Sequence, residues 1–228
     1  MINNSQPLKI RYHFVDELRG VAVLLMVIFH FAYDLMLFGF VQIDFQNDLF
    51  WFGLPRVIVF LFLFCVGISL SLVHKTKIHW PKFSKRWLLL VLYAAIISIS
   101  TYFMFPQRWI YWGTLHCIAF CSLAALPFLR TPNLALILAL PLLAGALFFK
   151  INIPWILLPH RSMDYIPPFP WLAVALLGIF AASKKFHEYR PPEIIGLSRP
   201  LRFMGRHALI FYVIHQPLMF FLFKAFKS

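Results

Sequence analysis

The first apolar run of the chain carries ionisable side chains where a membrane-spanning helix is expected to carry none. Residues 11–35 read RYHFVDELRGVAVLLMVIFHFAYDL, a stretch long enough to cross a bilayer. Because ionisable groups at membrane depth are costly, they mark candidate functional sites. The structural alternative is that the acidic and basic residues near position 19 only anchor the helix at the lipid headgroups.

Helical geometry places several of the ionisable residues of this run on one face. At about 100° per residue, five residues fall in a sector roughly 100° wide: Asp16, Arg19, Gly20, His30 and Asp34. His30 and Asp34 are one turn apart, a spacing at which a carboxylate can orient an imidazole and stabilise its protonated form. We interpret them as a candidate proton-transfer pair. The structural alternative is an ion pair between Asp34 and Arg56.

Two further histidines lie inside apolar runs. His116 belongs to YWGTLHCIAF (111–120) and His215 to FYVIHQPLMF (211–220). A lone intramembrane histidine often has a structural role, bonding a backbone carbonyl or a neighbouring helix. Histidine is also the side chain best suited to proton transfer near neutral pH. Three histidines in one small bundle therefore favour a functional cluster.

The composition is that of a membrane protein. Of 228 residues, 61% are hydrophobic and 13% are charged, about half the charge of a typical soluble domain. A net charge of +13 would suggest nucleic acid for a soluble protein. Here the Lys and Arg residues lie in short loops between apolar runs, where they set topology. We expect one membrane domain over residues 1–228 and no nucleic-acid binding.

The apolar runs predict an all-α fold, a polytopic transmembrane helix bundle of about seven spans, with six or eight as alternatives. The runs are 17–38, 52–73, 86–105, 110–129, 134–149, 168–183 and 206–226. The fifth and sixth are short for a core about 30 Å thick. Basic residues concentrate in the loops 74–87 and 183–206. The positive-inside rule therefore predicts a cytoplasmic N-terminus and puts both loops on the same side.

The basic residues at the predicted cytoplasmic helix ends are candidates for binding a phosphorylated donor. Arginine binds phosphate in bidentate fashion, and a glycine lets a ligand or a helix approach the backbone closely. The candidates on this side are Arg11, Asp16, Arg19, Gly20, Arg86 and Arg206. Topology anchoring and contacts with anionic lipids are the alternative explanation.

The segment 150–170 contains five prolines and is too rigid and too apolar for a plain linker. We expect it to fold back over the outer mouth of the bundle. The candidate substrate-binding residues on this side are Arg56, His160, Arg161, Asp164 and Trp171. No metal is expected: His30 and Asp34 have the i, i+4 spacing of possible ligands, but a carboxylate–histidine dyad explains that pair without a metal. The three cysteines fit small core residues without a disulfide.

Five segments, taken in order, resemble the bacterial branch of the heparan-alpha-glucosaminide N-acetyltransferase catalytic-domain family. They are the opening 11–35, LFLFCVGISLSL (61–72), YWGTLHCIAF (111–120), PPFPWLAVALLG (167–178) and FMGRHALIFYVIHQPL (203–218). The D-x-x-R-G…H pattern of the opening is also similar to that of the wider membrane acyltransferases that modify sugars.

The resemblance implies a multi-pass acyltransferase of the bacterial inner membrane. Acetyl-CoA, or another acyl-CoA, would bind from the cytoplasmic side, and the acyl group would pass to an amine or hydroxyl of an extracytoplasmic sugar such as glucosamine. His30 would be the general base on the acceptor, with Asp34 orienting it. His116 or His215 would polarise the thioester carbonyl or assist the base. Related enzymes suggest a homodimer.

One departure from the family leaves alternatives open. In the lysosomal members the active-site histidine lies in the non-cytosolic loop after the first helix, whereas residues 39–51 contain no histidine. That role must move to His30, His116 or another residue, or be absent. The alternatives to an acyltransferase are a proton-coupled small-molecule transporter, with the histidines and Asp34 as a proton relay, and a non-catalytic membrane scaffold.

Overall fold

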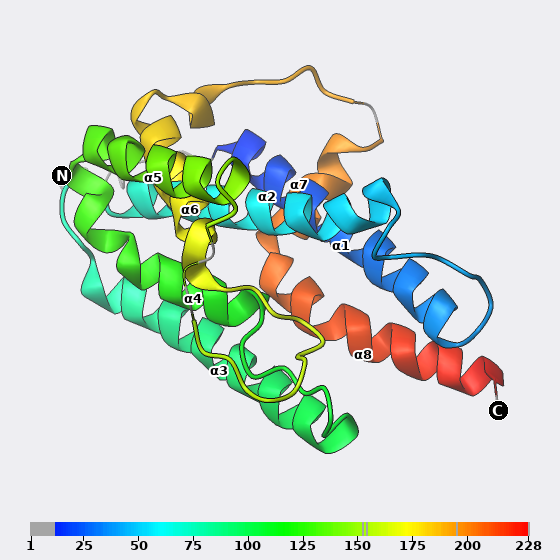
Figure 1. Cartoon of the computed structure of the whole chain (residues 1–228). Coiled ribbons are helices and arrows are strands. Elements are labelled where there is room, and N and C mark those ends of the chain that lie inside the picture. The colour runs from blue at the N-terminus through cyan, green and yellow to red at the C-terminus, as the bar shows by residue number, and fades with distance from the viewer. Residues whose placement is uncertain (1–11, 152, 154, 195, 228) are drawn as a thin grey trace.

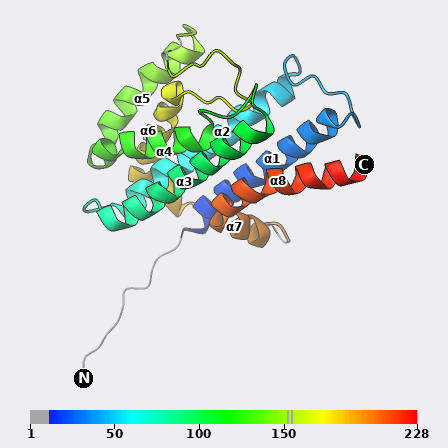
Figure 2. The ribbon, with the colours of Figure 1, turned by 90° about the horizontal axis from the view of Figure 1, so that it is seen from below.

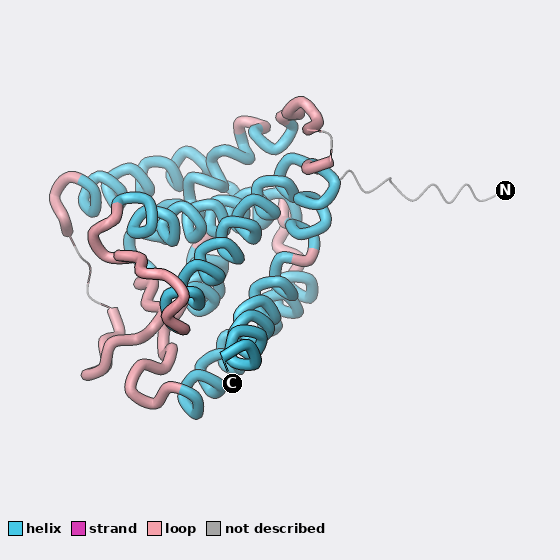
Figure 3. The backbone as a smooth tube through the Cα atoms, turned by 90° about the vertical axis from the view of Figure 1, so that its right-hand side faces the viewer, coloured by secondary structure: helices cyan, strands magenta, loops and turns pink. Residues whose placement is uncertain are grey.

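The computed structural model describes residues 12–151, 153, 155–194 and 196–227, and within these it contains helices and loops but no strand (Figures 1 and 3). The helices are α1 (His13–Leu37), α2 (Leu49–Val73), α3 (Trp80–Met104), α4 (Thr114–Ala124), α5 (Pro132–Leu147), α6 (Pro168–Ser183), α7 (Ser198–Arg206) and α8 (Ala208–Lys227). Two short 3-10 helices cover Leu126–Arg130 and Phe186–Glu188. The predicted all-α class is confirmed.

Four of these helices, α1, α2, α3 and α8, are long and apolar enough to cross a membrane. The first three have 25 residues each, about 38 Å of helix at 1.5 Å per residue, which exceeds a hydrocarbon core of about 30 Å. The helices α4, α5 and α6 are apolar but shorter. The fold is therefore a helical membrane bundle of long and short helices.

The predicted run 206–226 corresponds to one helix, α8, which begins at Ala208. The chain forms a separate helix, α7, and turns at His207 before α8 begins. The segment before 206 was predicted as a basic loop because it holds several arginines. Part of it becomes an amphipathic helix because Leu201 and Gly205 are buried against α1, whereas the arginines stay nearer the surface.

The bundle is organised around α1 and α2. Helices α2, α7 and α8 pack on α1, α6 packs on α2, α5 packs on α6, and α3 packs on α4. Figure 2 shows α1 and α8 side by side. Glycines allow the closest contacts, since a Cβ on Gly67 would overlap the carbonyl of Ala175 and one on Gly178 would overlap that of Phe64. Small residues of this kind are typical of helix interfaces in membranes.

The two ends of the bundle differ in composition. The basic end comprises the start of α1, the end of α2, the start of α3 and all of α7. The loop end comprises the end of α1, the start of α2 and of α4, and the loops 38–48, 105–113 and 148–167. The long loops are drawn in pink on the left of Figure 3.

The proline-rich segment folds back onto the loop end, as expected. The backbone N–H of Met163 donates to the carbonyl of Arg108 over 3.0 Å, and the Trp112 indole donates to the carbonyl of Ile166 over 2.9 Å. The N–H of Thr114, at the start of α4, donates to the Asp164 carboxylate over 2.8 Å. This segment therefore closes over the 105–113 loop and the beginning of α4.

Candidate functional site

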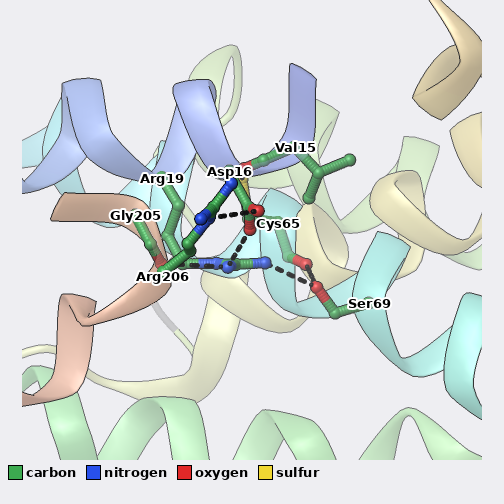
Figure 4. Close-up of polar contacts among 7 residues, drawn as sticks. All are labelled: Val15, Asp16, Arg19, Cys65, Ser69, Gly205 and Arg206. Carbon is green, nitrogen blue, oxygen red and sulfur yellow. Dashed lines mark hydrogen bonds and ion pairs between the residues drawn. The ribbon is translucent and has the colours of Figure 1, made fainter. Parts of the chain in front are cut away.

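The guanidinium of Arg19 joins three helices at the basic end (Figure 4). Nη1 donates to Asp16 Oδ1 over 3.2 Å and to the carbonyl of Gly205 over 3.1 Å, and Nη2 donates to Ser69 Oγ over 2.9 Å. The Ser69 hydroxyl in turn donates to the carbonyl of Cys65 over 2.6 Å. Arg19 is therefore occupied in holding α1, α2 and α7 together.

The glycines beside this cluster explain why α7 sits so close to α1. A Cβ on Gly20 would overlap the carbonyl oxygen of Leu201, and one on Gly205 would overlap that of Asp16. A ligand cannot occupy that face of Gly20 while α7 is in place. Of the two partners predicted for Gly20, a ligand or a helix, the helix is the one observed.

Two arginines of α7, Arg202 and Arg206, are also paired. Arg202 Nε lies 2.6 Å from Glu17 Oε1 and its Nη1 lies 2.9 Å from Glu193 Oε1. The hydrogen bond that Arg202 donates to the Glu17 carboxylate raises the pKa of the Arg202 guanidinium above its ordinary value. Arg206 Nε lies 3.7 Å from Asp16 Oδ2. The predicted donor residue Arg11 lies outside the described residues.

Two of the three membrane histidines come together further along α1. The ring centroids of His30 and His215 are 4.9 Å apart. His215 Nδ1 lies 2.9 Å from the carbonyls of Phe211 and Tyr212, and since carbonyls only accept, Nδ1 must carry the proton. His215 Nε2 is buried and has no hydrogen-bond partner among the described residues. In neutral His215 that nitrogen is an available proton acceptor.

Asp34 lies in the same region and is fully buried. Its Oδ1 accepts a hydrogen bond from Gln216 Nε2 over 3.0 Å, whereas Oδ2 has no partner within the described chain. Gln216 was missed by the sequence analysis. The signal was present, since Gln216 follows His215 directly in an otherwise apolar run. A buried polar atom without a partner is costly, so this carboxylate is a candidate for function.

Two predicted pairings of Asp34 are absent from the described residues. No hydrogen bond joins Asp34 to His30, because Gln216 of α8 reaches the carboxylate instead. No ion pair joins Asp34 to Arg56 either: Arg56 donates to the carbonyl of Phe52, and its guanidinium stacks 3.6 Å from that ring centroid. The ion-pair alternative for Asp34 was therefore wrong.

The third histidine, His116, lies in the first turn of α4 with both ring nitrogens bonded. Nδ1 accepts from the N–H of Gly113 over 3.1 Å, so the proton sits on Nε2, 3.2 Å from Ser98 Oγ. The Ser98 hydroxyl donates to the carbonyl of Ile110 over 2.6 Å. These bonds hold α4 against α3. Both ring nitrogens of His116 have a partner.

Asp164 acts at the beginning of α4. Its carboxylate accepts from the N–H and the hydroxyl of Thr114 over 2.8 and 3.3 Å, a favourable place for an anion because of the helix dipole. Burial raises the pKa of Asp164, and the bonds from Thr114 oppose that rise. Tyr212 of α8 lies near enough to interact with Thr114 and Asp164. This carboxylate thus connects the proline-rich loop to α4.

An open cavity of about 730 Å³ lies at the loop end. Of the predicted substrate-binding residues it is lined by Arg56, His160 and Arg161, while Trp171 packs against the hydrophobic core. The remaining wall is rich in rings: Phe29, Phe45, Trp51, Phe52, Tyr111 and Tyr165. Aromatic faces beside guanidinium groups suit a polar ring such as a sugar. None of its lining residues is acidic.

One protein-family model matches the chain. The model of the family described as "Heparan-alpha-glucosaminide N-acetyltransferase, catalytic" matches residues 11–217. The chain belongs to this family. No curated protein and no solved structure matches it.

Membership in this family, together with the four long apolar helices, makes the chain an integral membrane protein with an acetyltransferase-like function. Membership in this family also implies, in general, an acyl-CoA co-substrate. No group of three or more His, Cys, Asp or Glu side chains that could hold a metal ion occurs among the described residues.

Proposed function

We propose that the chain is a multi-pass acyltransferase of the bacterial inner membrane, which moves an acetyl group from acetyl-CoA to the amine or hydroxyl of an extracytoplasmic sugar such as glucosamine. The observation that carries this proposal is the contact between His30 and His215, whose rings lie 4.9 Å apart on two apolar helices. Asp34, buried beside them, has one carboxylate oxygen without a partner within the described chain.

The proposed donor side is the basic end. The loops 74–87 and 183–206 carry most of the loop Lys and Arg residues, and such loops stay in the cytoplasm. Acetyl-CoA is made in the cytoplasm and carries several phosphate charges, so a basic, cytoplasmic mouth suits it. The proposed acceptor side is the cavity that Arg56, His160 and Arg161 line.

The proposed chemistry needs one proton acceptor between the two sides. The acceptor nitrogen or oxygen bonds to the thioester carbonyl carbon while a histidine takes the proton from that nitrogen or oxygen. The C–S bond then breaks, and the thiolate of CoA leaves and receives a proton in turn. His215 Nε2 supports this role because its other nitrogen is already tied to backbone carbonyls. His30 lies against that ring and shares the general-base role, and Asp34 stabilises the positive charge that develops.

The test is acetyl transfer by the purified full chain from acetyl-CoA to glucosamine. We expect His30→Gln and His215→Gln each to reduce transfer about 100-fold or more, the usual contribution of a general base, while CoA binding is retained. His13→Gln is the matched control, because His13 is exposed at the start of α1. Full turnover in both histidine variants would remove the pair from the mechanism.

The same preparation distinguishes the alternatives. Substrate-dependent proton flux in liposomes, without acetyl transfer, would favour a transporter. Absence of both activities, with unchanged stability of the two histidine variants, would favour a scaffold. The predicted homodimer is tested separately by the mass of the purified protein in detergent.

A further inference from the structure

A small cavity of about 40 Å³ lies at the basic end, between α2, α3 and α4. Its polar lining consists of cations, hydroxyls and one indole: Ser69, His74, Lys82, Arg86, Trp87 and Ser122. No acidic residue lines it. We propose that this cavity is a phosphate-binding subsite and, on the function proposed above, that it holds a phosphate group of the acyl-CoA donor.

The first observation that supports a phosphate site is the environment of Arg86. It lies at the second turn of α3 and makes no hydrogen bond or ion pair with any described residue, and Arg19 lies close enough to repel it. Its side chain remains accessible, so a ligand can reach it. An arginine that lies near membrane depth and has no partner for its charge is stabilised by an anion. A guanidinium suits phosphate because it can donate two parallel hydrogen bonds.

The second observation that supports a phosphate site is the N–H donor of His74. This residue caps the C-terminal end of α2 and only 4% of its surface is exposed. Its Nδ1 accepts from the backbone N–H of His79 over 3.1 Å, so the proton of the neutral ring sits on Nε2. That N–H donor has no partner among the described residues. Burial lowers the pKa of His74, and the charges of His79, Arg86 and Lys82 lower it further, which indicates a cluster of positive charge without an anion.

The remaining lining residues close the cavity rather than supply donors. The Trp87 indole donates to the carbonyl of Ala119 over 3.0 Å and ties α3 to α4. The hydroxyls of Ser69 and Ser122 donate to the carbonyls of Cys65 and Ile118. A phosphate would therefore receive its hydrogen bonds from Arg86, Lys82 and His74.

Three other arginines at the basic end differ from Arg86 because they form ion pairs. Arg19 and Arg206 share Asp16, and Arg202 has Glu17 and Glu193. These guanidiniums are neutralised within the chain, whereas Arg86 is not. Of the arginines predicted for the donor, Arg86 is thus the one whose charge the fold leaves uncompensated in the described residues.

The test is calorimetric titration of the purified full chain with CoA, and with pantetheine, which lacks phosphate. We expect Arg86→Gln to weaken CoA binding at least about tenfold and to leave pantetheine binding unchanged. Lys85→Gln is the matched control, because Lys85 is exposed on the same turn of α3 and does not line the cavity. It should change CoA affinity less than about twofold.

A second arm separates the donor from a lipid headgroup as the source of the phosphate. The same proteins are melted in phosphatidylcholine nanodiscs with and without phosphatidic acid. Stabilisation of the native chain by phosphatidic acid, lost in Arg86→Gln but kept in Lys85→Gln, would support the subsite with a lipid as its ligand, even if no acetyl transfer is found.

The proposal is overturned if Arg86→Gln and Lys85→Gln bind CoA equally well and respond equally to phosphatidic acid. That outcome leaves acetyl transfer intact, so it is distinct from failure of the proposed function. If Arg86→Gln does not fold, Lys82→Gln and His74→Gln decide the question, each with an expected loss of about threefold or more in CoA affinity.

Discussion

The two ends of α1 treat their charged residues in opposite ways. At the basic end, the Arg19 guanidinium donates hydrogen bonds to Asp16, Ser69 and the carbonyl of Gly205. Further along, His215 Nε2 and Asp34 Oδ2 are buried without a partner in the described chain. The first helix therefore contributes to a satisfied cluster at one end and, together with α8, to an unsatisfied one further along.

The difference separates structural polarity from functional polarity. A satisfied buried network rigidifies the fold, while an unsatisfied one costs stability and is retained for another reason. By this criterion the D-x-x-R-G pattern at residues 16–20 is a helix-docking element, and the histidine pair is the candidate for chemistry. The same criterion separates His116, whose two nitrogens are bonded, from His215.

The largest expected effect comes from closing the contact between α1 and α7. Gly20→Ala should abolish folding or lower the melting temperature severely, because the new methyl group overlaps the backbone of Leu201 and overpacking costs several kcal/mol. Gly53→Ala is the control, since nothing lies within 4 Å of a Cβ there, and a helical alanine stabilises slightly. Melting in detergent measures both. Equal melting temperatures would disprove the close contact.

Arg19→Gln should reduce the stability of the folded chain by about 2 kcal/mol, because it leaves buried acceptors on three helices without their donor. Urea titration followed by intrinsic fluorescence measures the change. Arg190→Gln removes an equal charge from an exposed position and should be neutral. A stability like that of the native chain would mean that the satisfied cluster is not structural.

Asp34→Asn tests the opposite cluster. The amide keeps the shape and removes a buried charge, so stability should stay unchanged or rise by about 1 kcal/mol. Acetyl transfer should fall about tenfold or more, because the charge that stabilises the histidinium is lost. Thermal melting and transfer are measured on the same sample. A loss of stability comparable to that of Arg19→Gln, with full activity, would reverse the comparison.

The smallest effect concerns His74. Its pKa is below the unfolded value of about 6.5, so the unfolded chain binds more protons in the window just below that value. Stability should therefore rise with pH there. His74→Gln should lose this part of the rise, less than about 1 kcal/mol. Melting at about pH 5.5 and about pH 7.5 measures the difference, and identical pH slopes would contradict it.

The sequence predicted the fold class and most of the elements, because long apolar runs have few alternatives. The sixth predicted run, 168–183, coincides with α6. The sequence did not predict α7, because a short segment rich in arginine resembles a loop until its buried residues Leu201 and Gly205 meet α1. It also extended the fourth run beyond α4, since apolar composition does not show where a helix changes to 3-10 geometry.

For the candidate site, sequence periodicity placed His30 and Asp34 on α1 but could not show which side chains of other helices reach them. Gln216 takes the place predicted for a bond between Asp34 and His30. Arg56 turns to its own helix rather than toward Asp34. Such outcomes depend on the rotation and the depth of neighbouring helices, which no local pattern encodes. The catalytic and binding roles of these residues stay predictions.

The shortness of α4 has a consequence for the electrical barrier between the two sides of the membrane. Its 11 residues span about 17 Å, less than half the length of α3 beside it. The irregular segments 105–113 and 155–167 meet its beginning, and non-helical backbone at that depth must be enclosed by protein or reached by water. Where water reaches the beginning of α4, the membrane voltage falls over a shorter distance than in the surrounding lipid, so the field acting on a proton or an anion there is stronger.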